Sequence, residues 1–216
     1  MIKDKQAPIV SINRLRIKTD GEGIRSLVFF YGCKLRCKYC INPHTWDLTK
    51  PPEFYTTESL LKEVKIDDIY FRCTNGGVTF GGGEPLLHSG FIKEFIEKAP
   101  SAWNYWVETS LAVEWGKVEA VAPFITKFVV DIKSLDRDVY KAYTGMSLDL
   151  ARSNLIKLLA MVGSEKIIVR VPFIPNYMRK DQQLESVEKL KNLGAMNIEV
   201  FDYTTEIKGG SYSLIK

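Results

Sequence analysis

A chain of 216 residues with 45% hydrophobic, 12% aromatic and 26% charged residues has the composition of a folded globular protein, which excludes disordered, collagen-like and coiled-coil chains. No apolar run approaches the roughly 18 residues that a membrane span needs, and the first residues lack the apolar stretch of a signal peptide. The net charge of +4 is too small to indicate nucleic acid. We therefore expect a cytoplasmic protein with neither a membrane nor a nucleic-acid partner.

The positive charge is concentrated near the start of the chain. Residues 1–50 contain ten Lys or Arg against four Asp or Glu, whereas the rest of the chain contains twenty bases and twenty-two acids. This local excess either steers an anionic ligand or partner toward the segment or forms a solvated basic face.

Apolar runs and helical periodicities alternate along the chain, punctuated by Gly and Pro. The predicted strands, rich in Val, Ile, Phe and Tyr, are residues 27–31, 78–80, 105–108, 128–132, 167–173 and 198–201. The predicted helices are residues 57–64, 89–98, 111–121, 136–143, 150–162 and 181–193. This alternation predicts an α/β fold with a parallel sheet, either a partial barrel or an open doubly wound sheet. No linker or repeat divides the chain, so we expect a single domain over residues 1–216.

Polar motifs follow the first four predicted strands. In order along the chain, they are Cys33 to Cys40, Gly81-Gly82-Gly83-Glu84-Pro85, Glu108-Thr109-Ser110 and Asp131-Ile132-Lys133. Ligands of both architectures bind at the C-terminal ends of the strands, so we expect these motifs to form the functional site.

The cysteines Cys33, Cys37 and Cys40 lie within eight residues, a spacing that favours metal or redox chemistry over a disulfide framework. An iron–sulfur cluster normally takes four cysteines, so three would leave one iron open to another ligand. His44 lies four residues after Cys40, which keeps a structural zinc site with three thiolates and one imidazole as an alternative. Cys73 stands alone and is expected to be a small buried hydrophobe.

The glycine run of residues 81–83 lets a ligand approach the backbone closely, and Glu84 offers an acceptor to an ammonium group. The same stretch taken alone also fits a tight turn between strand and helix with a solvated Glu. Its interpretation therefore depends on the motifs around it.

Together these motifs resemble the radical S-adenosylmethionine enzymes, and within them the glycyl-radical-enzyme activating enzymes. The matching stretches are 19–25, 29–33, 37–42, Thr45-Trp46-Asp47, 76–80, 83–87, 131–133 and Tyr143-Thr144-Gly145. The three-cysteine motif with Gly-Gly-Glu-Pro is typical of the superfamily, and Thr19-Asp20-Gly21 and Gly-Gly-Val-Thr-Phe point to the activating enzymes. The resemblance covers nearly the whole chain.

The resemblance implies a 4Fe-4S cluster on Cys33, Cys37 and Cys40, with S-adenosylmethionine bound to the open iron. The implied cofactor contacts are Tyr39 and Ile41 beside the adenine, Gly82, Gly83 and Glu84 at the ammonium group, Thr109, Asp131 and Lys133 at the ribose and carboxylate, and Arg170 near the carboxylate. Asp20 and Lys133 are implied as catalytic, with Asp20 at the cofactor or the substrate loop. Without the resemblance, Asp131 and Lys133 would be an ion pair at a strand end and Arg170 a surface residue.

The resemblance also implies a partial (β/α)6 barrel without a ferredoxin-like insert, acting as a monomer. The implied reaction is reductive cleavage of S-adenosylmethionine and abstraction of a glycine hydrogen from a partner glycyl radical enzyme. A flavodoxin or a ferredoxin-type protein would donate the electron.

Two alternatives come from other classes. A small-molecule radical enzyme such as the 7-carboxy-7-deazaguanine synthases shares Gly-Glu-Gly before the cysteines and Gly-Gly-Glu-Pro after them, whereas Asp131-Ile132-Lys133 favours the activating enzymes. A non-catalytic metal-binding or electron-carrying protein would leave Glu84, Asp131 and Lys133 without a shared role. The activating enzymes usually carry Asp-Thr-Asn-Gly or Asp-Thr-Ser-Gly where this chain has Glu108-Thr109-Ser110-Leu111.

Overall fold

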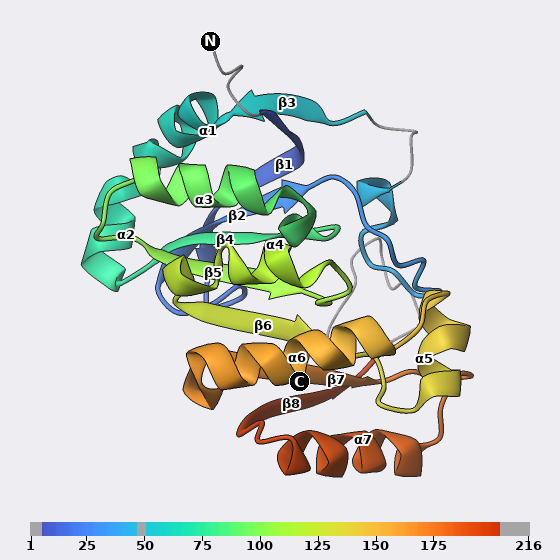
Figure 1. Cartoon of the computed structure of the whole chain (residues 1–216). Coiled ribbons are helices and arrows are strands. Elements are labelled where there is room, and N and C mark those ends of the chain that lie inside the picture. Colours follow the sequence, from blue (N-terminus) through green and yellow to red (C-terminus); the bar gives the residue numbers. More distant parts are fainter. Residues whose placement is uncertain (1–5, 47–50, 204–216) are drawn as a thin grey trace. The chain divides into compact units, whose positions relative to one another are not determined.

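A computed structural model describes residues 6–46 and 51–203, so Asp47 of the matching motif lies outside the described residues. The chain divides into two compact units. The first comprises residues 1–33, 42–109 and 114–128, and the second comprises residues 34–41, 110–113 and 129–216. Helices and strands alternate along most of the chain, as Figure 1 shows.

The strands of the first unit are arranged in the order β3-β1-β2-β4-β5. Their bounds are β1 Gln6–Ile17, β2 Ile24–Phe30, β3 Glu53–Thr56, β4 Gly77–Gly82 and β5 Asn104–Thr109. β4 runs parallel to both β2 and β5, whereas β1 is antiparallel to both β2 and β3. The residues that follow β2, β4 and β5 are therefore brought to one edge of the sheet.

Short helices connect these strands. They are α1 Thr57–Val64, α2 Asp68–Thr74, α3 Ser89–Lys98 and α4 Trp115–Glu119, with 3-10 turns η1 Pro43–Thr45, η2 Lys65–Asp67, η3 Pro85–His88 and η4 Ala122–Phe124. α3 shows why these sequences form amphipathic helices: Phe91, Ile92 and Phe95 are buried, and Glu97 and Lys98 are exposed.

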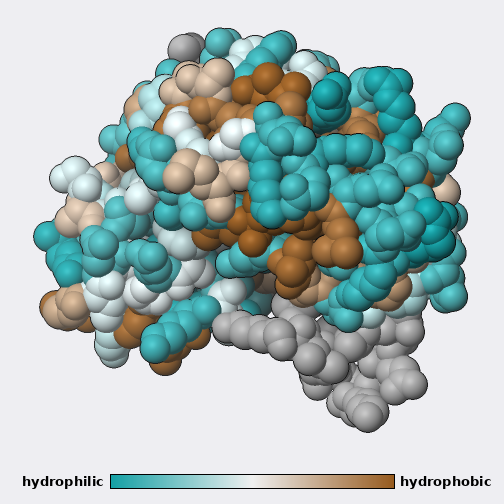
Figure 2. All heavy atoms as spheres, turned by 90° about the horizontal axis from the view of Figure 1, so that it is seen from below, coloured by the Kyte–Doolittle hydropathy of each residue, from teal (hydrophilic) through white to brown (hydrophobic). Residues whose placement is uncertain are grey.

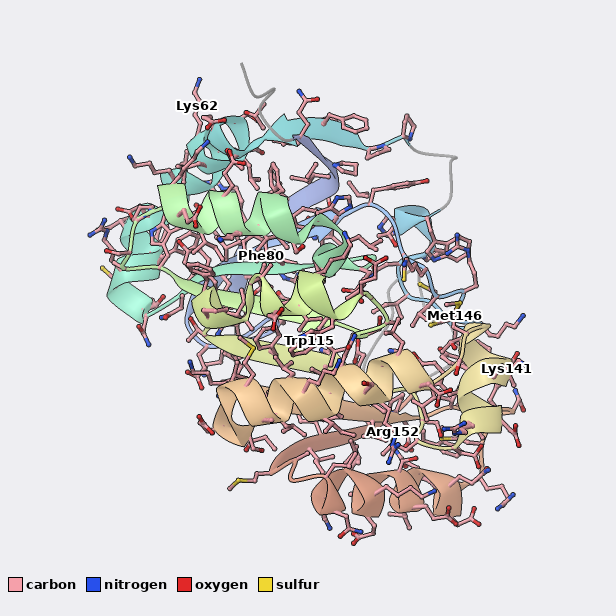
Figure 3. The ribbon with its side chains drawn as sticks, in the orientation of Figure 1. Lys62, Phe80, Trp115, Lys141, Met146 and Arg152 are labelled. Atoms are coloured by element: carbon pink, nitrogen blue, oxygen red, sulfur yellow. The ribbon has the colours of Figure 1, made fainter. Side chains whose placement is uncertain are left out.

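Aromatic side chains fill the core of the first unit. Phe80 on β4 is fully buried, and its ring meets Phe95 edge-on at 5.8 Å and lies 6.1 Å from Phe30. Phe80 lies among these interior side chains in Figure 3, where Lys62 points outward. Full burial of one such side chain contributes about 1.5 to 3 kcal/mol.

Arg25 on β2 is a charged residue within this core, with 0% exposure. Its guanidinium donates to Thr79 Oγ1 at 2.7 Å and to the carbonyl oxygens of Val78 and Asn104, both at 2.8 Å. It also lies 5.1 Å from the centre of the Trp106 ring. Burial lowers the pKa of Arg25 to about 10, so the residue is still charged at neutral pH. Arg25 therefore ties β2, β4 and β5 together.

The second unit is also built from alternating strands and helices. Its elements are the end of β6 Lys127–Asp131, α5 Arg137–Thr144, α6 Asp149–Val162, η5 Ser164–Lys166, β7 Ile167–Phe173, α7 Lys180–Asn192 and β8 Asn197–Asp202. The strand order is β6-β7-β8, and β7 runs parallel to β8. The Asp136 side chain accepts the N–H groups of Asp138 and Val139 and so begins α5, and Gly145 ends it at φ 77°.

The predicted α/β class with a largely parallel sheet is confirmed, and all six predicted strands are present. β1, β3 and α2 were not predicted from the sequence. The helix expected over residues 111–121 was wrong in its first part, since only Trp115–Glu119 is α-helical. Leu111 has φ 56°, and the Asn154 amide donates to the carbonyl oxygens of Leu111 and Val113 at 2.9 and 2.7 Å. These bonds hold the segment out of a helix.

On the face that Figure 2 presents, hydrophilic side chains surround several hydrophobic patches. None of the helices in the described ranges is both long and apolar enough to span a bilayer.

Candidate functional site

The loop that follows β2 carries the three predicted metal ligands. Cys33 belongs to the first unit, and Cys37 and Cys40 belong to the second. All three cysteines are half-buried, and none of them forms a disulfide in the described part of the chain. The backbone N–H of Cys40 donates to the carbonyl oxygen of Cys37 at 3.2 Å, which holds these two ligands on one tight turn.

In the first unit, hydrogen bonds fix the backbone just before Cys33. The N–H of Gly32 donates to the carbonyl oxygen of Thr45 at 2.6 Å. Nε2 of His88 lies 3.0 Å from the carbonyl oxygen of Tyr31, which can only accept, so Nε2 carries the proton in this contact. Burial lowers the pKa of His88 and favours its neutral ring. The start of the cysteine loop is therefore anchored before any metal binds.

Glu84 follows β4 and is only 1% exposed. Its Oε1 accepts from the hydroxyl of Thr109 at 2.7 Å and from the N–H of Leu86 at 3.3 Å. Thr109 is the last residue of β5, so two predicted cofactor contacts from neighbouring strand ends are bonded to each other. A carboxylate offers about four acceptor positions, and these bonds are compatible with a further one from an ammonium group.

Gly82 and Gly83 lie against the protein's own backbone. A Cβ on Gly82, whose φ is 102°, would lie 2.7 Å from the nitrogen of Phe30, and one on Gly83 would lie 2.2 Å from the oxygen of Gly32. The N–H groups of Gly83 and Glu84 donate to the carbonyl oxygens of Phe30 and Gly32 at 3.0 and 2.7 Å. The packing of β4 against the end of β2 thus requires glycine here, besides any room that a ligand needs.

Asp20 lies in the turn between β1 and β2. Its carboxylate accepts from Arg16 Nε at 2.6 Å and from Thr19 Oγ1 at 2.8 Å, and its backbone oxygen accepts from Thr79 Oγ1 at 2.7 Å. These contacts hold the turn, and none of them is with Glu84, Thr109 or a cysteine. The catalytic role of Asp20 stays a prediction.

In the second unit, Asp131 and Lys133 at the end of β6 form a charged cluster with Arg170, which lies in the middle of β7. Arg170 donates to both carboxylate oxygens of Asp131, at 2.9 and 3.2 Å, and Lys133 Nζ lies 3.5 Å from Asp131 Oδ2. Lys133 also donates to the hydroxyl of Tyr203 at 3.1 Å. The ion pair of Asp131 and Lys133, which the sequence offered as the alternative to a cofactor role, is therefore present, and Arg170 joins it. The cofactor roles of the three residues stay predictions.

The charges of this cluster stabilise one another. Burial opposes ionisation of Asp131, but Arg170 and Lys133 outweigh it and hold the pKa of Asp131 below its ordinary value. Burial also opposes the charge of Lys133, but Asp131 outweighs it and the pKa of Lys133 is raised well above its ordinary value. Two cations against one anion leave a net positive charge, which suits an anionic group such as a carboxylate.

Cys37 and Tyr39 pack against a hydrophobic core of the second unit. The buried members of that core are Val139, Tyr143, Ile174 and Met178. Burial raises the pKa of the Cys37 thiol to about 11, with Lys133 opposing the shift, so a metal must displace a bound proton. The hydroxyl of Tyr39 accepts from Asn176 Nδ2 at 3.1 Å, which orients its ring, while Ile41 is 43% exposed.

The donor set fits an iron–sulfur cluster. Three cysteines lie half-buried on one loop, and thiolates are the usual ligands of such clusters. Within residues 6–46 and 51–203, no three Cys, His, Asp or Glu side chains are already gathered as a metal site, so binding must complete it. The prediction for Cys73 was wrong: it is exposed, because α2 presents it to solvent together with Ile69 and Tyr70.

Sequence reasoning missed two contacts at these strand ends. His88 supports the backbone before Cys33, and only its position four residues after Glu84 could have suggested this. Tyr203, the residue after β8, accepts a hydrogen bond from Lys133, a contact that residue types alone do not predict.

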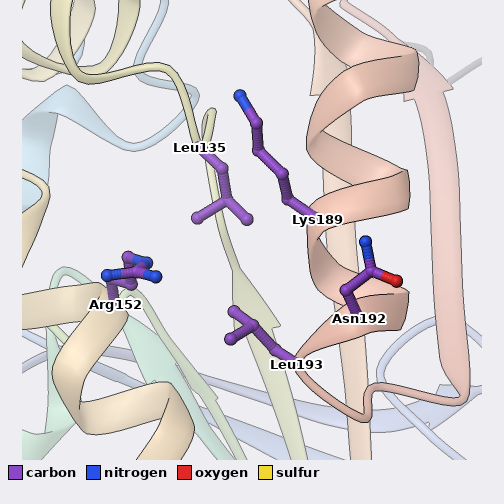
Figure 4. A pocket seen from close by; sticks show the side chains of 5 residues that line it. All are labelled: Leu135, Arg152, Lys189, Asn192 and Leu193. Atoms are coloured by element: carbon purple, nitrogen blue, oxygen red, sulfur yellow. The ribbon is translucent and has the colours of Figure 1, made fainter.

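A separate hollow of about 210 Å³ lies in the second unit (Figure 4). It is lined by Leu135, Arg152, Lys189, Asn192 and Leu193, none of which is a predicted site residue. The positive charges of Arg152 and Lys189 would attract an anion. The lining also includes the C-terminal end of α7, however, whose carbonyl dipoles repel an anion. We assign it no role.

Comparison with known proteins identifies the family of the chain. Residues 19–119 match the family described as a 4Fe-4S single cluster domain. The pyruvate formate-lyase-activating enzyme of Clostridium pasteurianum is 33% identical over 174 residues, which cover 81% of this chain and 71% of that protein. The (2S)-3-sulfopropanediol dehydratase activating enzyme of Klebsiella oxytoca is 30% identical over 229 residues, which cover 78% of this chain and 71% of that protein.

The fold is found in solved structures as well. SuiB of Streptococcus suis, solved with S-adenosylmethionine bound, matches with a TM-score of 0.59 at 20% identity, covering 86% of this chain and 41% of that chain. This likeness shows the fold of the radical S-adenosylmethionine enzymes, and the chain belongs to their glycyl-radical-enzyme activating family. It is an oxidoreductase whose cofactors are a 4Fe-4S cluster and S-adenosylmethionine.

Proposed function

We propose that this chain activates a glycyl radical enzyme by removing a hydrogen atom from a glycine Cα of that partner. The observation that carries the proposal is the set of three half-buried cysteines on the loop after β2. Its relatives from Clostridium pasteurianum and Klebsiella oxytoca are both named as activating enzymes of another enzyme, which supports a protein substrate.

In this proposal Cys33, Cys37 and Cys40 hold the cluster through their thiolates. When bound, the reduced cluster and S-adenosylmethionine together supply the chemistry that abstracts a hydrogen atom. Glu84 accepts a bond from the ammonium group of S-adenosylmethionine, and Thr109 holds the Glu84 carboxylate in place by its bond of 2.7 Å.

Lys133 and Arg170 provide the positive charge that attracts the cofactor carboxylate. Asp131 lies between them and prevents two adjacent cations from repelling each other, since it contacts both. Tyr203 accepts from Lys133 and fixes the direction of its ammonium group. Tyr39 and Ile41 flank the adenine.

The electron donor is proposed to be an acidic protein of the flavodoxin or ferredoxin type. Every second residue of the loop from 34 to 38 is an exposed cation, namely Lys34, Arg36 and Lys38. Such a row of cations attracts a negatively charged surface and speeds its encounter at low salt.

The test is a reconstitution with the partner. The reduced protein, loaded with iron, sulfide and S-adenosylmethionine under anaerobic conditions, is mixed with the glycyl radical enzyme encoded beside it, and electron paramagnetic resonance is recorded. We expect a glycyl radical on the partner, and no such signal when the partner's radical glycine is changed to Ala.

Two results would contradict the proposal. One is a radical signal that survives the glycine change. The other is 5′-deoxyadenosine released together with a modified small molecule, which would move the chain to the small-molecule radical enzymes.

A further inference from the structure

The Tyr143-Thr144-Gly145 motif has no part in the cofactor contacts described above. It forms the C-terminal end of α5, in the second unit. The carbonyl oxygen of Thr144 accepts the N–H of Arg36 at 2.8 Å, and that of Tyr143 accepts the N–H of Lys38 at 3.1 Å. Two backbone bonds from one helix end therefore hold the residues on either side of Cys37.

The helix end can do this because its last carbonyl groups have no partner within the helix. Their direction is set by Thr144, which is fully buried. Its hydroxyl donates to the carbonyl oxygen of Tyr140 at 2.7 Å and accepts the N–H of Met146 at 3.2 Å. Gly145 then turns the chain away in the left-handed conformation, at φ 77°.

A ring contact adds to these bonds. The ring of Tyr39 lies 6.0 Å from that of Tyr143 and 5.6 Å from that of Tyr177, in both cases edge-on. Tyr143 is fully buried and lies 5.4 Å from Tyr177, so Tyr39 packs against a fixed surface. The segment from Arg36 to Tyr39 is thus held by backbone bonds and by aromatic packing.

We propose that Tyr143 and Thr144 are positioning residues that hold the Cys37 segment in its cluster-binding conformation. The inference rests on the proposed ligation of the cluster by Cys37. A loop that is ordered before the metal arrives loses less conformational entropy on binding, so these residues favour uptake and retention of iron without touching it.

The test compares variants of the full chain in two measurements. Tyr143→Leu removes the ring and Thr144→Val removes the hydroxyl, while Tyr143→Phe keeps the ring and Thr144→Ser keeps the hydroxyl. Hydrogen exchange of the peptide covering residues 34–41 is measured in the metal-free protein, and iron release to a chelator is measured in the reconstituted protein.

We expect exchange of this peptide and release of iron to be about five- to tenfold faster in Tyr143→Leu and Thr144→Val, corresponding to the loss of one packing or hydrogen-bond contact. Tyr143→Phe and Thr144→Ser should stay near wild type. Lys141→Ala, on the same helix but exposed and pointing outward in Figure 3, should change neither measurement.

A core variant separates positioning from general stability. Leu155→Ala removes a fully buried side chain of α6 in the same unit, and α6 supplies none of the backbone bonds or ring contacts given above for the loop. If it sped iron release as much as Tyr143→Leu at equal unfolding free energy, the proposal would be wrong. Wild-type rates in a folded, iron-loaded Tyr143→Leu protein would also overturn it, whereas failure of the wild type to take up iron would instead refute ligation by Cys37.

Discussion

Glu84 is a buried carboxylate whose orientation is fixed by the Thr109 hydroxyl and the Leu86 N–H. Neither partner is charged. An ammonium group from S-adenosylmethionine would pair its positive charge with this carboxylate. The negative charge, rather than the shape of the side chain, is what the proposed contact needs.

Glu84→Gln tests that charge, because the amide keeps the size and can still accept from Thr109. We expect iron content near wild type and S-adenosylmethionine affinity about ten- to a hundredfold weaker, since a hydrogen bond to a charged group contributes about 1.5 to 3 kcal/mol. Calorimetric titration measures the affinity. Glu119→Gln, at the exposed end of α4, is the control, and unchanged affinity in Glu84→Gln would remove Glu84 from the site.

Gly83 allows a second prediction at this scale. A Cβ there would lie 2.2 Å from the backbone oxygen of Gly32, which cannot move aside as a flexible side chain can. We expect Gly83→Ala to destabilise the protein by about 1 to 3 kcal/mol in urea unfolding. Gly116→Ala, whose Cβ would have no neighbour within 4 Å, should be neutral or slightly stabilising. Equal stabilities for the two variants would contradict this account.

The chemistry of several site residues could be predicted from sequence, but their mutual contacts could not. The thiols and the Asp131, Lys133 and Arg170 cluster follow from motif and strand position. The bond from Thr109 to Glu84 depends on the register between two strands far apart in the chain, which the residue types alone do not determine. The same is true of the bond from Lys133 to Tyr203.

Among the elements, the buried strands were predictable because they are short runs of Val, Ile, Phe and Tyr. β1 was not, since it carries Pro8, Arg14 and Arg16 and is exposed over much of its length. β3 has only four residues, too few to show a strand pattern. α2 places Ile69 and Tyr70 on its exposed side, so its hydrophobic residues do not mark the buried face of the helix. These elements are stabilised by tertiary pairing rather than by a local pattern.

Asp67, the last residue of η2, connects that turn to the strands β1 and β2. Its carboxylate is fully buried and accepts from Arg14 at 2.6 and 2.8 Å and from Ser26 at 2.9 Å. Burial opposes its ionisation, but Arg14 and Ser26 outweigh it and lower the pKa of Asp67 below its ordinary value. The carboxylate therefore stabilises the folded state above the unfolded pKa of about 4, and this contribution is lost as pH falls.

Asp67→Asn should remove that contribution. We expect a lower free energy of unfolding at pH 7, by about 1 to 3 kcal/mol, and a flatter dependence on pH below about 4. Urea unfolding at a series of pH values measures both. Glu97→Gln on the exposed face of α3 should leave the curve unchanged, and a variant curve parallel to wild type at all pH values would refute the pKa argument.

At the scale of the whole molecule, the metal content decides between the 4Fe-4S cluster and the structural zinc site. After anaerobic reconstitution we expect about four irons per chain, with broad visible absorption, and their loss when Cys33, Cys37 or Cys40 is changed to Ala. Cys73→Ala and His44→Ala should keep the iron. Loss of the metal in His44→Ala, or stoichiometric zinc in place of iron, would support the zinc site instead.

The sequence identified the class of the molecule because its motifs fall at the strand ends of an α/β fold. It did not indicate that the boundary between the two compact units passes between Cys33 and Lys34. The partner is likewise not encoded in any one residue pattern, because a docking surface depends on side chains gathered from several elements.

Arg25 sets a limit on how this chain can vary. Its planar guanidinium reaches a threonine hydroxyl and two carbonyl oxygens of neighbouring strands at once, and it lies beside Trp106. Lysine has the charge but not the fork of donors, and an apolar residue would make none of these bonds. In a library of all substitutions at position 25, selected for folded protein, arginine should be the single residue recovered.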